Sequence, residues 1–188
     1  MADKMLDRPL RKYNQKHCTT NMENPIQYYF VSQSFNIPES LETDKFRLEV
    51  LTPSVAEKDY EAVMSSKARL RSVFDESTEW PKDTMSLEEN IKDLQKHERE
   101  FKLRKAFAYT VLTPTREKCV GCVYIDPCKV IEFDCEVYIW VRDDCLYLDN
   151  DLYNNIRDWM VSYWPFKKIA FPGREISWED WKLYSAHN

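Results

Sequence analysis

The stretch VIEFDCEVYIWVR, residues 130–142, decides the fold because its side chains alternate without interruption. One set is apolar and consists of Ile131, Phe133, Cys135, Val137, Ile139 and Val141. The other set is polar or aromatic and consists of Glu132, Asp134, Glu136, Tyr138, Trp140 and Arg142. Successive side chains of a strand point to opposite faces of a sheet. We therefore predict one long strand with a packed face and a polar-aromatic face.

The residues after this strand predict a helix and then a short second strand. Apolar residues recur at helical spacing between 149 and 163, Pro165 ends the helix, and residues 167–171 read KKIAF. A strand–helix–strand unit is almost always a right-handed parallel crossover. We expect strands 130–142 and 167–171 to be parallel and to separate at their carboxyl ends, where open α/β sheets bind ligands.

The remaining pattern predicts a mixed sheet with helices. Ser86 and Glu89 form a capping box, which is typical of the first turn of a helix. The other expected elements are a strand at 46–51, one long or two short helices over 55–74, strands at 106–112 and 119–125, and a last helix at 178–185. This order predicts a mixed α/β (α+β) fold.

The sequence is divided into an arm and one domain. Residues 1–44 are expected to be an N-terminal arm and connector, partly ordered, with a short strand at 26–31, and residues 45–188 the folded domain. A chain of 188 residues is long enough to bury a proper core.

Composition excludes several classes of protein. The chain has two glycines, Gly121 and Gly173, so it contains neither a Rossmann fingerprint nor a P-loop. A net charge of −5 argues against nucleic acid as the main partner. No apolar run is long enough for a membrane span or a signal peptide, and the six cysteines suit a reducing compartment. We expect a cytoplasmic protein without a membrane or nucleic-acid partner.

The element order, with these lengths, resembles the GNAT-type N-acetyltransferase fold over roughly residues 46–185. The resemblance is carried by TMSLEENIKDLQKHEREF at 84–101, AFAYTVL at 106–112, CVGCVYIDP at 119–127, VYIWVR at 137–142 and WPFKKIAFPGR at 164–174. It implies a parallel, splayed strand pair in the central sheet. It also implies transfer of an acetyl or other acyl group from acyl-CoA, as co-substrate, to an amine.

The resemblance also implies roles for particular residues. Glu136, or alternatively Asp134, would be the catalytic base, and Tyr184 would protonate the departing thiolate. Asp134 and Tyr138 would bind the acceptor, a small amine or a basic peptide drawn to an acidic-aromatic face. The acyl-CoA would contact the end of the long strand, at Ile139, Trp140, Val141 and Arg142.

One part of the sequence departs from the family pattern. The loop that should hold the CoA diphosphate, residues 142–151, has no glycine and four carboxylates. Between 126 and 151 there are eight acidic and two basic residues, a net charge of −6. A diphosphate about 4 Å from a carboxylate would be repelled by roughly 4 kcal/mol at an effective dielectric near 20.

This departure motivates a second hypothesis. In it, the chain is a non-catalytic GNAT-like binding protein whose acidic-aromatic groove holds a basic ligand or a protein partner. The alternative without a functional role is that Glu136 is an ordinary charged residue on a solvent-exposed face of the sheet. Three basic residues could meet a CoA phosphate or an acidic partner, or simply lie on a solvated helix face: Lys67, Arg69 and Arg71.

Two further features have structural interpretations. Cys119 and Cys122 have the C-x-x-C spacing of a zinc ligand pair, but residues three apart in a strand point to opposite faces, so we expect structural thiols and no metal. The tryptophans near the carboxyl end suit either core packing, which we favour, or an aromatic pocket or homodimer surface.

Overall fold

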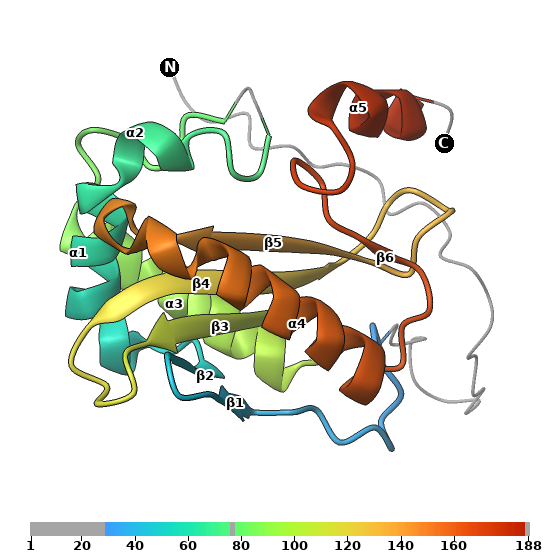
Figure 1. Cartoon of the computed structure of the whole chain (residues 1–188), viewed down its shortest axis with the longest axis horizontal. Helices are drawn as coiled ribbons and strands as arrows, with labels where there is room; N and C mark the ends of the chain where they lie inside the picture. The colour runs from blue at the N-terminus through green and yellow to red at the C-terminus, as the bar shows by residue number, and fades with distance from the viewer. Residues whose placement is uncertain (1–28, 76–77, 187–188) are drawn as a thin grey trace, which may run out of the picture.

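The protein is built on a six-stranded mixed sheet in the order β1-β2-β3-β4-β5-β6 (Figure 1). This computed structural model describes residues 29–75 and 78–186. The strands are β1 (Ser40–Glu42), β2 (Arg47–Val50), β3 (Phe107–Leu112), β4 (Cys119–Pro127), β5 (Cys135–Val141) and β6 (Ile169–Ala170). Among these six strands, only the β5–β6 pair is parallel. The predicted mixed α/β fold with one parallel pair is confirmed.

Helices cover both faces of this sheet. They are α1 (Ala56–Ser65), α2 (Lys67–Leu70), α3 (Leu87–Lys102), α4 (Asp149–Tyr163) and α5 (Trp178–Ala186), with 3-10 turns η1 (Pro53–Val55) and η2 (Asp143–Leu148). In Figure 1, α4 crosses the front of the sheet and α3 lies behind it. The predicted capping box of α3 is present, because the Ser86 hydroxyl accepts from the Glu89 N–H and the Glu89 carboxylate accepts from the Ser86 N–H.

The core has two layers, one on each face of the sheet. On one face α4 packs against the apolar side chains of β5, among them Val137 and Ile139. On the other face α1, α2 and α3 cover Tyr138 and Trp140, which are 7% and 0% exposed. The predicted alternation is therefore present, but the polar-aromatic face is covered by helices instead of lying in solvent.

The long strand is shorter than predicted. Residues 130–134 form a turn, and β5 begins at Cys135. The last pair of the β4–β5 ladder is Pro127 with Cys135, so residues 128–134 are needed to reverse the chain. Asp134 lies in this turn, and its carboxylate accepts the backbone N–H groups of Lys167 and Lys168 at 2.8 and 3.0 Å.

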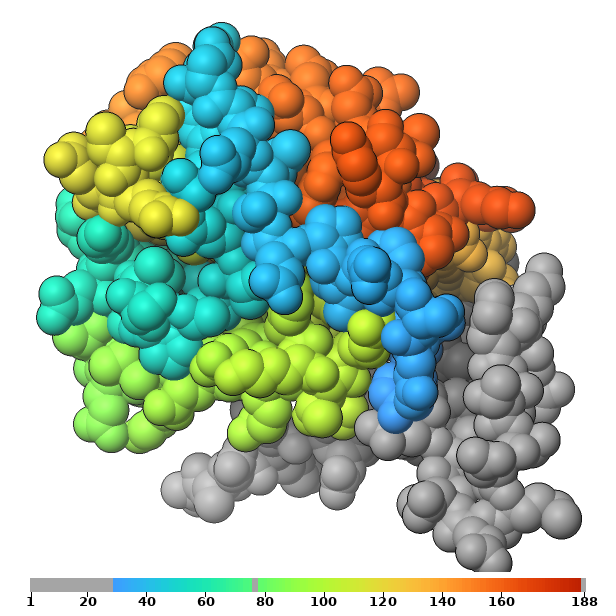
Figure 2. Space-filling model, turned by 90° about the horizontal axis from the view of Figure 1, so that it is seen from below, coloured from blue at the N-terminus to red at the C-terminus, as the bar shows by residue number. Residues whose placement is uncertain are grey.

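Residues before β2 add to the sheet and to the core. Residues 29–39 lie across the surface between the end of α3 and the chain near residue 166 (Figure 2). Phe30 stacks on Phe107 and Phe166, and Val31 is buried. The strand expected at 26–31 falls partly outside the described residues, and residues 29–31 are not in a strand. Within the described ranges, no helix has the length and apolar content needed to cross a membrane.

A β-bulge distorts β4 at its start. Val111 pairs with Gly121 but Leu112 pairs with Cys119, which leaves Val120 as the extra residue. The bulge reverses the alternation, so Cys119 and Cys122 both point into the core layer beneath α1 and α3. Our expectation that these two side chains diverge is wrong for this reason.

Candidate active site

The parallel strands β5 and β6 separate after a short ladder. Their paired residues are Cys135 with Ile169 and Glu136 with Ala170, while β5 continues to Val141. The N–H of Arg142 donates to the Val120 carbonyl in β4. Because successive residues of a strand direct their main-chain groups to opposite sides, the N–H and C=O groups of Ile139 and Val141 point away from β4. Within residues 29–75 and 78–186, no strand lies on this side of the end of β5, as predicted. We call residues 137–141 on this side the open edge of β5.

Two guanidinium groups lie on the open edge of β5. Arg174 donates to the Ile139 carbonyl at 3.2 Å and makes a two-pronged contact with the Asp149 carboxylate at 2.6 and 2.8 Å. Arg69, from α2, donates to the Val141 carbonyl and to Asp143. Both side chains are partly exposed. The Ile139 and Val141 carbonyl groups, which a ligand on the open edge would meet, thus already accept hydrogen bonds from two arginine side chains.

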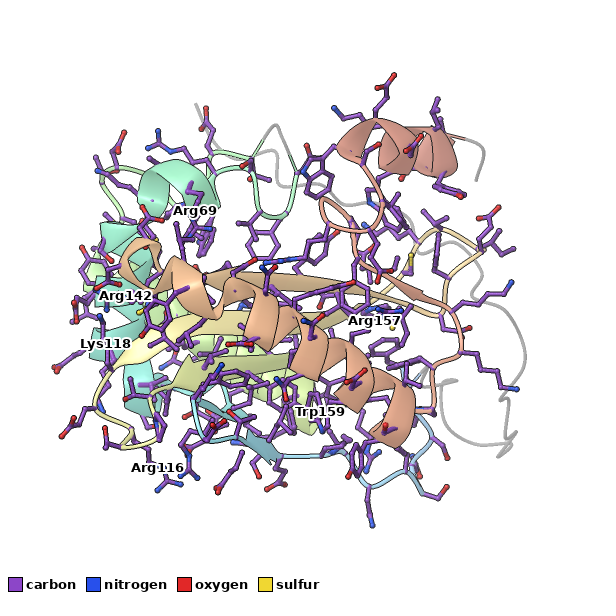
Figure 3. The ribbon with its side chains drawn as sticks, in the orientation of Figure 1. Arg69, Arg116, Lys118, Arg142, Arg157 and Trp159 are labelled. Carbon is purple, nitrogen blue, oxygen red and sulfur yellow. The ribbon has the colours of Figure 1, made fainter. Side chains whose placement is uncertain are left out.

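The acidic loop after β5 is paired with basic side chains. Besides Asp143 and Asp149, Asp144 pairs with Lys118 at 2.6 Å and with Arg142 at 2.7 Å. Figure 3 shows Arg69, Arg142 and Lys118 together at this end of the sheet. Because cations neutralise these carboxylates, the loop would repel a diphosphate less than its composition suggests.

Arg142 itself is not available on the surface. Its side chain is 6% exposed and pairs with Glu61 at 3.0 Å as well as with Asp144. It also donates to the Cys119 carbonyl at 3.4 Å. This arginine ties the end of β5 to α1 and β4, whereas Arg69 and Arg174 are the basic groups that face the open edge.

Two carboxylates lie side by side where the strands begin to separate. Asp126 of β4 is directly opposite Glu136 of β5, and both are half-buried. The Cys128 thiol and the Tyr138 hydroxyl are polar neighbours of Glu136 that favour its charged form. Burial raises the pKa of Glu136, and burial together with the Glu136 charge raises the pKa of Asp126 to about 7. A carboxyl pair of this kind can take up a proton near neutral pH.

The raised pKa of Asp126 predicts a pH dependence of stability. The folded protein holds a proton that the unfolded chain releases near its ordinary pKa of 3.8, so the free energy of unfolding should fall as the pH rises from about 4 to about 7. Asparagine cannot ionise, so Asp126→Asn should show a smaller fall in the free energy of unfolding. We expect the difference from wild type to be on the order of 2–4 kcal/mol at neutral pH. Urea unfolding from pH 4 to 8 measures it. An identical slope for the Asp126→Asn variant and the wild-type protein would contradict the assignment.

A cluster of aromatic rings lies next to this carboxyl pair on the helix-covered face of the sheet. Tyr138 stacks on Trp178 at 6.4 Å between ring centroids, and Phe74 meets Tyr124 and Tyr138 edge-on at 5.1 and 5.3 Å. His97 of α3 tilts against Tyr124, and burial lowers its pKa to about 4, so it is neutral at neutral pH. A cationic amine would here meet aromatic faces beside carboxylates.

The structure brings some of the predicted site residues together and separates others. Glu136 and Tyr138 are neighbours on one face of β5, and the main chains of Ile139 and Val141 form the open edge. The Trp140 side chain is fully buried, and Asp134 is engaged by backbone N–H groups.

Tyr184 lies elsewhere. Helix α5 begins above β5 and runs outward to the carboxyl terminus (Figure 1), and the Tyr184 ring packs on Phe133 and Trp181. It lines a shallow depression of about 500 Å³ with Glu132, Asp180 and neighbouring residues. Its assignment as the acid stays a prediction.

Sequence reasoning missed two of these groups. Asp126 closes the strand CVGCVYIDP, and only the register of that strand against β5 places it opposite Glu136. Arg174 follows the turn after β6 and reaches the open edge through tertiary packing. Arg69 is the one member of its predicted basic cluster on the edge, since Lys67 and Arg71 both pair with Asp83.

Solved structures similar to this chain are acetyltransferases of the GNAT type. One is the ribosomal-protein-S5-alanine acetyltransferase from Vibrio fischeri, with 18% identity over 79% of this chain and 80% of that one, and a TM-score of 0.57. Another is an acetyltransferase from Salmonella typhimurium that modifies the N-terminal serine of ribosomal protein L7/L12, with 16% identity over 66% and 67% and a TM-score of 0.52. No protein-family model and no curated protein matches the chain. The chain therefore has the GNAT-type acyl-CoA N-acyltransferase fold.

Proposed function

We propose that this protein is an N-acetyltransferase that moves an acetyl group from acetyl-CoA to an amine. The observation that carries the proposal is the open edge of β5, which begins beside the Asp126–Glu136 carboxyl pair. An extended pantetheine chain can bind such an edge as a strand would, through its amide groups. The thioester would then lie near a base. Ligands of open α/β sheets bind where parallel strands part.

The chain's own groups suit the chemical step. The amine nitrogen attacks the thioester carbonyl, a C–N bond forms and the C–S bond breaks. Glu136 accepts the proton that the amine loses, and its raised pKa fits that task. The departing thiolate takes up a proton, for which Tyr184 remains our candidate from the family resemblance.

The acceptor is proposed to bind as a cation and to release one proton to solvent before it attacks, so that Glu136 takes up only the second proton, lost as the amide forms. Aromatic rings lie beside the carboxyl pair, and the depression next to Tyr184 is lined by Glu132, Glu175 and Asp180. Two similar structures are named for acting on ribosomal-protein residues. A small amine or the N-terminus of a basic peptide would suit both features, and we expect the reaction in the cytoplasm.

Calorimetry with acetyl-CoA tests the proposal most directly. We expect a dissociation constant tighter than about 100 μM. The matched control ligand is adenosine 3′,5′-bisphosphate, which lacks the pantetheine arm and should bind much more weakly. Release of free CoA thiol with a panel of amines and basic peptides then measures transfer. No heat at millimolar acetyl-CoA would contradict the proposal.

Arg174 provides a second test of the same site. If its guanidinium moves from Asp149 to the CoA diphosphate, Arg174→Gln should weaken acetyl-CoA binding by about tenfold, the loss of one charge-assisted hydrogen bond. Arg157→Gln is the matched control, since Arg157 pairs with Glu175 at 3.6 Å and is mostly exposed. Calorimetry compares the two. Tighter binding in the Arg174 variant would mean that this arginine blocks the edge instead.

A specific observation also favours a second candidate function. Arg69 and Arg174 already satisfy two carbonyls of the open edge, and the following loop lacks glycine. A GNAT-like binding protein that no longer takes acyl-CoA, and holds a basic ligand or protein in the acidic-aromatic site, would have these features. Binding of a basic peptide without any binding of acetyl-CoA would support this candidate.

A further inference from the structure

A buried cluster of one carboxylate and two thiols lies beneath α1, on the β4 side of β5 and so opposite its open edge. Asp59 of α1 and Cys119 and Cys122 of β4 are each 3% exposed or less. A carboxylate oxygen and the two Sγ atoms all lie within 4.8 Å of one another. Cys122 Sγ is 3.3 Å from Asp59 Oδ1. The β-bulge at Val120 makes this possible, because it turns both cysteines to the same face.

The carboxylate in this cluster is buried without a cation. Within residues 29–75 and 78–186, the hydrogen bonds to Asp59 come from the Asn90 amide, at 2.9 Å, and the Cys122 thiol, both neutral. Buried carboxylates are usually paired with a positive charge or a metal. Burial accordingly raises the pKa of Asp59 and of Cys122. Three groups that can become anions thus face one another with no positive partner among the described residues.

The cluster supplies three of the four ligands of a tetrahedral zinc ion, at a spacing that suits it. Thiolate and carboxylate ligands at about 2.3 and 2.1 Å from a tetrahedral ion would lie roughly 3.6 Å apart, close to the observed S–O distance. The ligands are also held from behind. Asn90 donates to Oδ2, the other oxygen of Asp59, and the Thr110 hydroxyl lies 3.5 Å from Cys119 Sγ. Such outer hydrogen bonds orient metal ligands.

We propose that Asp59, Cys119 and Cys122 form a binding site for Zn²⁺, with Asn90 and Thr110 positioning the ligands. Binding displaces the thiol protons to solvent, so affinity should fall as the pH is lowered. The bound ion links α1 to β4 inside the core and contributes to stability. The proposal is independent of acyl transfer, and it gives the C-x-x-C spacing of β4 a role that simple alternation had excluded.

The test uses the full chain, expressed with added zinc and then examined with cobalt in place of zinc. Elemental analysis is expected to find one zinc ion per chain, and the Co²⁺ form should show thiolate-to-cobalt charge-transfer absorption. Cys122→Ala should abolish both signals. Cys135→Ala is the matched control, because Cys135 is equally buried but lies in the other core layer, and it should keep both. A strong chelator should lower the melting temperature of wild-type protein and not that of the Cys122 variant.

A second variant keeps the test decisive if the cysteine variants fail to fold. Asp59→Asn preserves size and can still accept from Asn90, so it should fold, and we expect it to weaken zinc binding by at least about tenfold. Zinc-free protein with reduced thiols and no cobalt absorption would overturn the proposal. Zinc retained in the Cys122→Ala variant, or bound by the Asp59→Asn variant with wild-type affinity in a competition titration against a chelator, would also overturn it, since the ion would then be bound elsewhere.

Discussion

Replacing Glu136 with glutamine is expected to lower acetyl-transfer turnover by roughly 10²–10⁴-fold while leaving acetyl-CoA affinity nearly unchanged. The two effects separate because different groups hold the two substrates. In the proposed complex the open edge of β5 binds the pantetheine arm through its main chain, whereas the Glu136 side chain acts only on the amine proton. Glutamine keeps the size and one hydrogen-bond acceptor for Tyr138 or Cys128, but it cannot take up that proton.

Steady-state rates and calorimetry on the same preparations measure this separation. Turnover of the wild-type protein should rise with pH as one group ionises. The Glu136→Gln variant should no longer show this rise in its pH–rate profile. Glu117→Gln changes an exposed carboxylate in the β3–β4 turn and should leave both quantities unaltered. Full turnover of the Glu136 variant at neutral pH would contradict its role as base and pass that role to Asp126, Asp134 or bulk water. Loss of basic-peptide binding, with no acyl transfer in wild type, would favour the binding protein.

The sequence predicted what depends on local pattern. Alternation over 135–141, helical spacing over 149–163 and the Ser86 capping box each follow from a few consecutive residues, and each is present. The parallel β5–β6 pair follows from the strand–helix–strand order, because a helical crossover connects parallel strands. These features needed no knowledge of which strands are neighbours elsewhere in the sheet.

Features that depend on register could not be predicted in this way. Alternation continues back to residue 130, yet β5 begins at Cys135 because the β4 ladder stops at Pro127. The bulge at Val120 exists only relative to β3, and it alone brings Cys119 beside Cys122. The Asp126–Glu136 pair and the contact of Arg174 with the Ile139 carbonyl likewise join segments whose alignment is set by the whole sheet.

Alanine at Gly121 is expected to have the largest effect on stability. Gly121 is paired with Val141 at the end of β5, and a Cβ atom placed on it would lie 2.1 Å from the Trp140 carbonyl oxygen and 3.0 Å from the Val141 Cα. Both obstacles are main-chain atoms, so relief requires that β4 and β5 move apart at the far end of the open edge, beside Val141. Overpacking of this kind typically costs about 1–3 kcal/mol, and more where backbone must move.

We therefore expect Gly121→Ala to lower the free energy of unfolding by about 3 kcal/mol or more. Urea unfolding should show a lower midpoint at an unchanged slope if the native state stays compact. Thr115→Ala, in the exposed turn between β3 and β4, should change the midpoint little. Because the strain falls on Trp140 and Val141, any folded Gly121→Ala protein should also bind acetyl-CoA more weakly. A midpoint equal to that of wild type would show that the two strands do not approach as closely as their ladder requires.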